Sequence, residues 1–399
     1  MKVKKFKNGL TLLVEERPSD SVAIEVSVGV GSKDETKKQA GLSHFLEHLL
    51  FEGTKNRTAQ QLSNEIESLG GDFNAATSQE RTHFYVHLPK EYFIRGIKIL
   101  ADMMVNPRFD EKSIEKEKNV VINEIRVVDD DPKQYQWVML LKHLFRGLPF
   151  SNPTYGNEHA IRAMTKQDVA SFFQQYYTAP NMSISIAGNV QVTKAIAVVK
   201  KEFAALQTHS VKRRTAYPVP APRQKRVFIK RNVEHSYLVM GFPASPFNHK
   251  DAAALEVLRT ILGRGQSSRL FNEIRTKRGI AYIVGALYEA EAHYGLFAAY
   301  VGTEPKDLPE ARRILIDQLS LENLTARELA DAKRSVMGSY LLANEDNKMR
   351  ADNNAFLYEL GMSRKKFLRN IRHVTLEEMK KLVKKYCTNK YTEILIKKR

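Results

Sequence analysis

The second half of this 399-residue chain repeats the order of the first half, and this internal repeat constrains the fold more than any other feature. Residues Leu62–Ile66 resemble Leu270–Ile274, at an offset of 272 − 64 = 208 residues. An alternating strand pattern precedes each of these helical segments, at Val22–Val30 and at Tyr237–Phe242. A repeat on this scale indicates duplication of a whole domain rather than a solenoid.

A proline-rich segment separates the two halves. Three prolines alternate with other residues in Tyr217–Pro222, which favours extended backbone and excludes a helix. We therefore predict a first domain at residues 1–212, a linker at 213–225 and a second domain at 226–399. Helical and strand patterns are mixed on each side of the linker, so both domains are predicted to contain α and β structure.

The pattern of the first half predicts a definite series of elements. A hairpin around the Asn8-Gly9 turn opens it, because Asn-Gly is a strong signal for a tight turn. Helices are then predicted at 41–51, 60–69, 90–104 and 110–127, and strands at 21–30, 82–88 and 183–187.

The charge of the chain does not by itself define a partner. There are 63 lysines and arginines against 45 acidic residues, a formal net charge of +18. Because these charges are interleaved and no nucleic-acid-binding motif is present, we expect no nucleic-acid partner. The one cysteine, Cys387, excludes an intrachain disulfide, and no apolar run reaches the roughly 20 residues of a membrane helix. We therefore expect a cytoplasmic protein without a membrane partner.

The helix predicted at 41–51 carries the chemistry. Its sequence contains His44, Glu47 and His48 in the order H-x-x-E-H, which is the inverzincin signature. Histidines four residues apart lie on one face of a helix and can bind the same zinc ion. Histidines at this spacing are commonly ordinary surface or core residues, but this helix is otherwise apolar. Burying three polar groups in it costs free energy unless they are paired or bind a metal.

A catalytic zinc ion usually takes three protein ligands, so a third ligand has to come from elsewhere. The helix predicted at 110–127 offers Glu115, Glu117 and Glu124. Glu117 and Glu124 are seven residues apart and therefore share a face of the helix. Spacing alone leaves the choice among these glutamates open.

These residues resemble the M16 metallopeptidases, which include pitrilysin, insulin-degrading enzyme and the mitochondrial processing peptidases. The segment Gly41–Thr54 closely follows the zinc helix of that family, and Asn8-Gly9-Leu10 is similar to its opening hairpin. The resemblance implies that Glu124 is the third zinc ligand, since 124 − 48 = 76 matches the family spacing. It also implies that Glu117 assists catalysis. In fold, it implies two homologous domains, each a mostly antiparallel sheet covered by helices, which together form half of a clamshell.

The resemblance extends to residues that would contact the substrate. Gly70–Ala75 is similar to the family segment whose edge strand pairs with the substrate backbone, which implies that Asn74 and Ala75 bind substrate. In the second half, Arg275 and Tyr282 match a family pair that reaches the substrate near the scissile bond.

The function expected from these features is that of a zinc metalloendopeptidase with one Zn²⁺ per chain. Glu47 would act as the general base on zinc-bound water and cleave peptides or unfolded segments inside a closed chamber. The alternative is a non-catalytic or regulatory partner subunit of a heterodimeric peptidase, although the complete motif argues against it. Because one chain supplies only two of the four homologous domains of a clamshell, we expect a homodimer, with a heterodimer as the alternative.

Overall fold

The computed structural model describes residues 1–212, 217, 218, 220 and 224–399, and these residues fall into two units. Unit 1 comprises Met1–Ile125, Asn152–Arg214 and Leu342–Glu359, and unit 2 comprises Arg126–Ser151, Thr215–Leu341 and Leu360–Arg399. The predicted linker, 213–225, lies largely outside the described residues. The units differ from the predicted contiguous domains because each contains a segment from the other half of the sequence.

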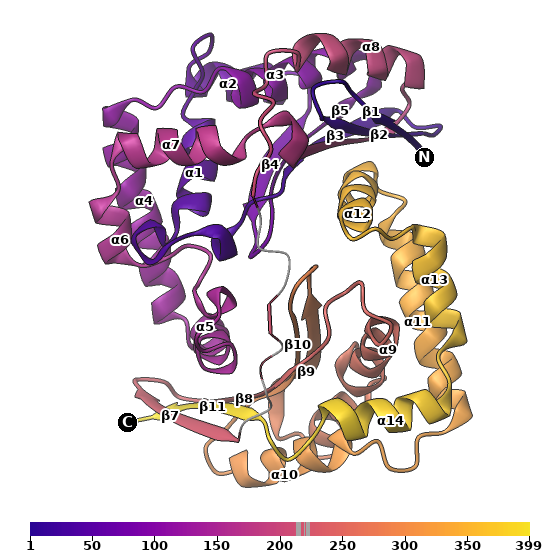
Figure 1. Cartoon of the computed structure of the whole chain (residues 1–399). Helices are drawn as coiled ribbons and strands as arrows, with labels where there is room; N and C mark the ends of the chain where they lie inside the picture. Colours follow the sequence, from indigo (N-terminus) through magenta and orange to yellow (C-terminus); the bar gives the residue numbers. More distant parts are fainter. Residues whose placement is uncertain (213–216, 219, 221–223) are drawn as a thin grey trace. The chain divides into compact units, whose positions relative to one another are not determined.

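Unit 1 is built on a sheet of six strands within the described residues, in the order β1-β2-β6-β3-β5-β4 (Figure 1). Its strands are β1 (Lys2–Lys5), β2 (Thr11–Glu16), β3 (Ser21–Val28), β4 (Asp72–Thr77), β5 (Thr82–Pro89) and β6 (Met182–Gly188). Its helices are α1 (Leu42–Phe51), α2 (Ala59–Glu67), α3 (Phe93–Val105), α4 (Glu111–Asp130, as far as Ile125), α6 (Glu158–Ala163), α7 (Lys166–Tyr176), α8 (Val192–Glu202) and α12 (Asn347–Glu359).

Unit 2 is built on a sheet of five strands in the described residues, in the order β7-β11-β8-β10-β9. Its strands are β7 (Lys225–Arg231), β8 (Ser236–Pro243), β9 (Ala281–Ala290), β10 (Gly295–Thr303) and β11 (Thr392–Lys398). Its helices are α5 (Pro132–Leu144), α9 (Ala252–Gly263), α10 (Leu308–Leu319), α11 (Ala326–Ala343, as far as Leu341), α13 (Arg364–His373) and α14 (Leu376–Tyr386), with a π-helical turn at Phe271–Thr276.

The two sheets share one pairing scheme, which agrees with the duplication inferred from the sequence. In unit 1, β2 pairs in parallel with β6, and the pairs β6–β3, β3–β5 and β5–β4 are antiparallel. In unit 2, β7 pairs in parallel with β11, and the pairs β11–β8, β8–β10 and β10–β9 are antiparallel. The predicted fold of two mixed α+β units with mostly antiparallel sheets is thus confirmed, and β1 has no counterpart among the described residues of unit 2.

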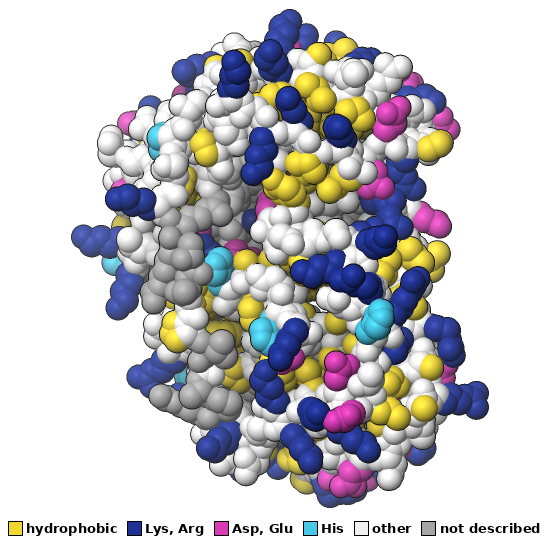
Figure 2. Space-filling model, turned by 45° about the vertical axis from the view of Figure 1, so that its right-hand side comes forward, with side chains coloured by type: hydrophobic (Ala, Val, Ile, Leu, Met, Phe, Trp, Pro, Cys, Tyr) yellow, Lys and Arg dark blue, Asp and Glu magenta, His cyan; other side chains and the backbone are white. Residues whose placement is uncertain are grey.

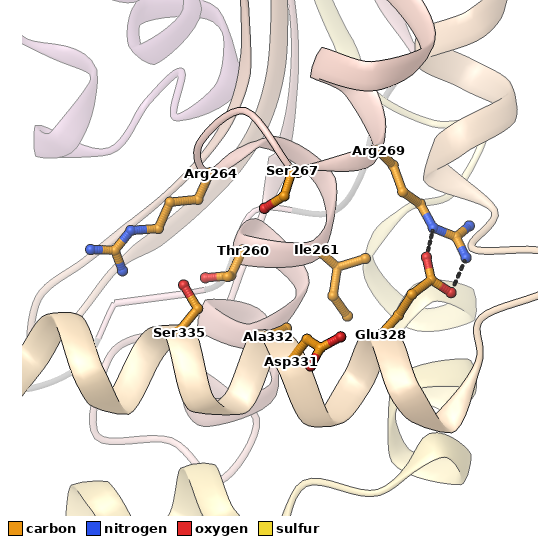
Figure 3. Close-up of a pocket in the computed structure, with 9 residues that line it drawn as sticks. All are labelled: Thr260, Ile261, Arg264, Ser267, Arg269, Glu328, Asp331, Ala332 and Ser335. Carbon is orange, nitrogen blue, oxygen red and sulfur yellow. Dashed lines mark hydrogen bonds and ion pairs between the residues drawn. The ribbon is translucent and has the colours of Figure 1, made fainter.

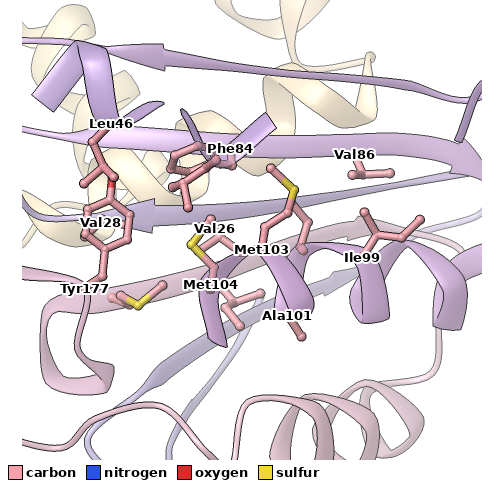
Figure 4. Close-up of a cluster of buried hydrophobic side chains, with 14 of the residues drawn as sticks. Val26, Val28, Leu46, Phe84, Val86, Ile99, Ala101, Met103, Met104 and Tyr177 are labelled. Atoms are coloured by element: carbon pink, nitrogen blue, oxygen red, sulfur yellow. The ribbon is translucent and has the colours of Figure 1, made fainter. Parts of the chain in front are cut away.

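The elements predicted for the first half are present within a few residues of their expected bounds. The opening hairpin turns at Gly9, whose φ of +95° lies in the left-handed region that glycine adopts without a steric penalty. The main core of unit 1 fills the face of the sheet that α1 and α3 cover. Figure 4 shows Val26 and Val28 of β3 facing Met103 and Met104 of α3 in this core.

The opposite face of the unit 1 sheet is covered by α12, which comes from the second half of the sequence. Because side chains alternate across a strand, Ala23 on β3 and Ala187 on β6 point away from the main core. There they pack against Ala351 of α12, and these small residues allow the helix to approach the sheet closely. An ion pair between Arg350 and Glu15, 2.8 Å apart, also fixes the helix to β2.

A helix from the first half covers the corresponding face of unit 2. Leu140 and Leu144 of α5 are buried against Tyr237 and Val239 of β8 and Ile394 of β11. Helix α9 packs on the other face of that sheet. Helices therefore pack on both faces of each sheet. One of these helices comes from the opposite half of the chain in each unit: α12 in unit 1 and α5 in unit 2.

A buried carboxylate fixes the loop that follows α1. Asp102 on α3 accepts hydrogen bonds from Thr54, Asn56 and Arg57, each 2.6 Å long, and from Asn106 at 2.9 Å. Burial raises the pKa of Asp102, but these hydrogen bonds outweigh the effect of burial and hold the pKa below its ordinary value. The charged form of Asp102 therefore stabilises the folded chain.

We predict that Asp102→Asn lowers the free energy of unfolding by about 3 kcal/mol near neutral pH, because it leaves buried donors without their charged partner. The pKa of Asp102 is lower in the folded chain than in the unfolded chain. Its stabilising contribution is therefore present above about pH 4 and is lost as the pH falls further. Urea denaturation at neutral and acidic pH measures both effects. The exposed Asp20→Asn is the control, and equal losses in the two variants would contradict the prediction.

Candidate metal site

Hydrophobic burial sets the orientation of α1. Phe45, Leu46 and Leu49 are at most 1% exposed, and they recur at the spacing that places them on one face of a helix. Figure 4 shows Leu46 next to Tyr177 and Val28 in the core. With this face fixed against the sheet, His44 and His48 are held on another face, where each side chain remains 19% exposed.

The start of α1 is held by a buried glutamate and a glycine. Both oxygens of Glu35 accept hydrogen bonds, one from the amide of Gly41 and one from the amide of Ser43, each 2.7 Å long. Burial raises the pKa of Glu35 to about 8, although these hydrogen bonds favour its charged form. Gly41 has a φ of +93°, and a Cβ atom there would lie 2.5 Å from the carbonyl oxygen of Tyr155. The sequence analysis did not identify Glu35.

His44, His48 and Glu124 come together beside α1. One ligand atom of each lies within 4.8 Å of the other two. Oε2 of Glu124 is 3.7 Å from Nε2 of His44 and 3.5 Å from Nε2 of His48. Glu124 is supplied by α4, on the face expected from its spacing to Glu117. Two imidazole nitrogens and one carboxylate oxygen are a donor set that Zn²⁺ prefers, so these residues fit the metal.

The two histidines differ in their electrostatic surroundings. Burial, with a smaller effect of His48, lowers the pKa of His44 to about 4, so His44 is neutral near pH 7. Its Nδ1 atom is buried and has no hydrogen-bond partner among the described residues. Burial lowers the pKa of His48, but a hydrogen bond to Glu117 and the charges of Glu124 and Glu47 outweigh this effect and raise it.

Glu117 orients His48. Its Oε2 atom lies 3.1 Å from Nδ1 of His48, and its side chain is only 8% exposed. Because Nδ1 is engaged in this way, the other ring nitrogen of His48 is the one that faces Glu124. A carboxylate that fixes the orientation of a ligating histidine is a common part of metal sites.

Glu47 is buried next to this cluster, and a residue that the sequence analysis missed contacts it. The hydroxyl of Thr77, at the end of β4, donates a 2.5 Å hydrogen bond to Oε2 of Glu47. Burial raises the pKa of Glu47, whereas the Thr77 hydrogen bond and His48 act against that rise. Thirty positions separate the two residues in sequence, so no local pattern could reveal their contact.

The predicted substrate-binding residues lie on a free sheet edge. In the described part of the chain, β4 pairs only with β5 and is the last strand of its sheet. Asn74 is exposed and Ala75 is half-buried. The side-chain oxygen of Asn74 accepts a 2.8 Å hydrogen bond from the amide of Ala75.

Arg275 and Tyr282 belong to unit 2, whereas the three ligand candidates belong to unit 1. Nη1 of Arg275 donates a 3.1 Å hydrogen bond to the carbonyl oxygen of Tyr282. The ring of Tyr282 lies 4.6 Å from that of His235, and the residue is 38% exposed. Partial burial, followed by the neighbouring Tyr237, raises the pKa of Tyr282, so its hydroxyl keeps its proton at neutral pH.

Comparison with protein families gives two matches along the chain. Residues 10–158 match the family model of the insulinases, peptidase family M16, and residues 163–336 match the model described as the M16 inactive domain. An uncharacterized zinc protease of Bacillus subtilis is 30% identical over 98% of this chain and 96% of its own length. This chain belongs to the M16 family.

Other M16 relatives give a consistent result. An uncharacterized zinc protease of Rickettsia felis is 33% identical over 86% of this chain and 84% of its own length. A protease from Helicobacter pylori has the same fold, with a TM-score of 0.91, 22% identity and coverage of 99% of both chains. An M16 inactive domain structure from Pseudomonas fluorescens also has a TM-score of 0.91, at 22% identity, over 100% of this chain and 98% of that one.

The second M16 unit does not carry His44, Glu47 or His48, the candidate site residues of α1, at the corresponding positions. At the repeat offset, His44 and Glu47 correspond to Ala252 and Leu255, both buried on α9. His48 corresponds to Glu256, which accepts a 2.8 Å hydrogen bond from Arg259. Among the described residues, His44, His48 and Glu124 form the only cluster of three or more such groups that could hold a metal ion.

A cavity of about 160 Å³ in unit 2 lies against α9 and α11 (Figure 3). Its two arginines each have an acidic partner. Arg269 pairs with Glu328 at 2.9 Å, and Arg264 lies 3.7 Å from Glu256. The charges around this cavity are therefore balanced within unit 2.

The surface of the M16 chain carries mixed charges. On the face shown in Figure 2, lysine and arginine side chains are spread out, with acidic and hydrophobic side chains between them. Across the described residues, no helix combines the length and the apolar character needed to cross a membrane.

Two glycine substitutions test how tightly the start of α1 is held. We predict that Gly41→Ala lowers the free energy of unfolding by about 3 kcal/mol, because it adds a backbone clash to an unfavourable positive φ. Gly70→Ala is the matched control, since Gly70 also has a positive φ, of +71°, but nothing lies within 4 Å of an added Cβ. It should cost only about 1 kcal/mol. Chemical denaturation compares the two, and similar losses would contradict a steric role for Gly41.

Proposed function

We propose that this chain is a zinc-dependent endopeptidase in which His44, His48 and Glu124 hold the metal and Glu47 acts as the general base. The observation that carries the proposal is the meeting of three ligand atoms within 4.8 Å of one another, beside a buried carboxylate. Membership of the M16 family and the zinc-protease names of relatives support it. His44, Glu47 and His48 share one sequence motif, whereas Glu124 comes from a separate helix, α4.

The roles of the residues follow from their positions. When bound, Zn²⁺ supplies Lewis-acid polarisation of the scissile carbonyl and lowers the pKa of a water molecule toward about 7. Glu47 takes the proton from the attacking water and passes it to the leaving amine. Burial raises the pKa of Glu47, whereas the charge of a bound zinc ion would lower it. Glu117 keeps His48 in the orientation that presents Nε2.

We also propose that the substrate is an extended peptide or an unfolded segment. A free sheet edge at β4 offers backbone groups to an added strand, near Asn74 and Ala75. Such binding recognises the backbone more than the side chains, so specificity would be broad. By the family resemblance, Tyr282 would donate a hydrogen bond to the developing oxyanion, and Arg275 would support Tyr282 or the substrate. Kinetics of Tyr282→Phe and Arg275→Ala would test these two roles.

The proposed assembly is a homodimer that encloses the substrate in a chamber, since each chain carries one complete set of the proposed site residues. A heterodimer with a related subunit is the alternative assembly, and sedimentation of the purified chain distinguishes it from the homodimer. A regulatory subunit without activity is the competing function. Complete retention of the ligand set and of Glu47 favours the enzyme.

We predict that the purified chain binds one Zn²⁺. Removing a ligand with His48→Ala should weaken zinc binding by more than the roughly 10–100-fold typical of changes to residues that only orient a ligand. The exposed His209→Ala is the control and should leave zinc content unchanged. Metal analysis after dialysis against a weak chelator measures both, and unaltered zinc in His48→Ala would exclude this ligand set.

We predict that Glu47→Gln reduces peptide hydrolysis by about 10²–10⁴-fold while zinc stays bound, because the amide cannot accept the proton of the attacking water. A screen with quenched fluorescent peptides, with and without chelator, measures the activity. Glu67→Gln, an exposed change on α2, is the control. Near-normal turnover by Glu47→Gln would rule out its role as the base.

A further inference from the structure

The hydrogen bond between Thr77 and Glu47 joins two parts of the proposed site that are far apart in sequence. Thr77 is the last residue of β4, the free edge strand, and Glu47 lies in the middle of α1. The Thr77 hydroxyl donates to Oε2 of Glu47 over 2.5 Å. The hydrogen bond therefore connects the strand proposed to bind substrate with the residue proposed to act as the base.

A general base needs a fixed carboxylate, and Glu47 has little else to fix it. Rotation about the last bond of a glutamate side chain is broad, so the carboxylate plane is poorly defined without a hydrogen bond. In the described part of the chain, Thr77 is the only hydrogen-bond partner recorded for the Glu47 carboxylate, and Oε1 has none. Tyr177 is buried near enough to interact electrostatically with Glu47, but no hydrogen bond joins its hydroxyl to Glu47 among the described residues.

Thr77 is suited to hold the carboxylate because its own position is well defined. Its side chain is β-branched and therefore stiff about χ1. Its backbone is paired with β5, where it lies opposite Thr82. The hydroxyl thus projects from a rigid strand and engages Oε2 of Glu47, while no described residue bonds Oε1.

We propose that Thr77 is a positioning residue for Glu47: its hydroxyl fixes one carboxylate oxygen so that the other is presented to the attacking water. This inference rests on the proposed function. It also assigns the terminal residue of β4 a role beyond pairing with substrate. A peptide added along this strand would be aligned by the same segment that orients the base, which couples substrate placement to catalysis.

The competing explanation is that the hydroxyl only satisfies a buried carboxylate. In that case, removal of the hydroxyl would lower the melting temperature or the zinc content, and kcat would change no more than KM. A positioning role predicts instead a selective loss in kcat, with recovery by any side chain that keeps a hydroxyl at this position.

The test compares Thr77→Val, which keeps the shape and removes the donor, with Thr77→Ser, which keeps the donor. In the full-length zinc-loaded chain, we expect Thr77→Val to lower kcat by about 10–100-fold, a part of the roughly 10²–10⁴-fold that general-base catalysis contributes, while KM changes by less than about threefold. Thr77→Ser should stay within about threefold of the wild-type kcat. Thr388→Val is the matched control, because the hydrogen bonds of the Thr388 hydroxyl are local: it donates to the carbonyl of Lys390 and accepts from the amide of the same residue. Zinc content and melting temperature are measured for every variant.

Adding Thr77→Val to Glu47→Gln provides a second readout, since removing the positioning residue should cause no further loss once the base is gone. If Thr77→Val does not fold, Thr77→Ala takes its place in the same comparison. An unchanged kcat in Thr77→Val, or equal losses in the valine and serine variants, would overturn the inference while leaving the proposed function intact. Absence of zinc-dependent hydrolysis by the wild-type chain would overturn the proposed function, and this inference with it.

Discussion

Helix α1 has to bury one face completely and still present polar groups on another. Phe45, Leu46 and Leu49 fix its rotation through their contacts with the core of unit 1, and Glu35 with Gly41 fixes where it begins. His44 and His48 then have no freedom to turn away from α4. The candidate metal site therefore depends on apolar packing that takes no part in the chemistry. Rigid elements of this kind hold ligands more accurately than loops do.

The sequence was sufficient to predict the parts of the site that depend on spacing along one helix. His44 and His48 share a face because they are four residues apart, and Glu117 and Glu124 do so because they are seven apart. Contacts between separate helices and strands could not be predicted from the sequence in this way. The hydrogen bond from Thr77 to Glu47 and the cap from Glu35 arise from the packing of separate segments, and threonine or glutamate in a loop or strand carries no signal of its partner.

The same limit explains the difference in domain organisation. Periodicity predicts that a helix has an apolar face, but it does not say which sheet that face will cover. Helices α5 and α12 each pack on the sheet of the other half, so contiguous domains could not describe them.

The duplicated helix of unit 2, α9, does not repeat the histidines and Glu47 of α1 at the corresponding positions. Leu255 of α9 is fully buried where α1 carries Glu47, so an apolar side chain packs at this position in place of a carboxylate.

The exchange of α5 and α12 has a consequence for how such a chain could be divided. A gene split between the two halves would yield two fragments, each lacking the helix that covers one face of its own sheet. The first fragment would carry α5 with Leu140 and Leu144 uncovered, and the second would expose the apolar face that contains Tyr237, Val239 and Ile394. Exposed apolar surface of this kind promotes aggregation. Each fragment would need the helix carried by the other to cover its sheet, so we expect the two to fold best when they are produced together. Each duplicated half thus depends on the other for the helix that covers one face of its sheet.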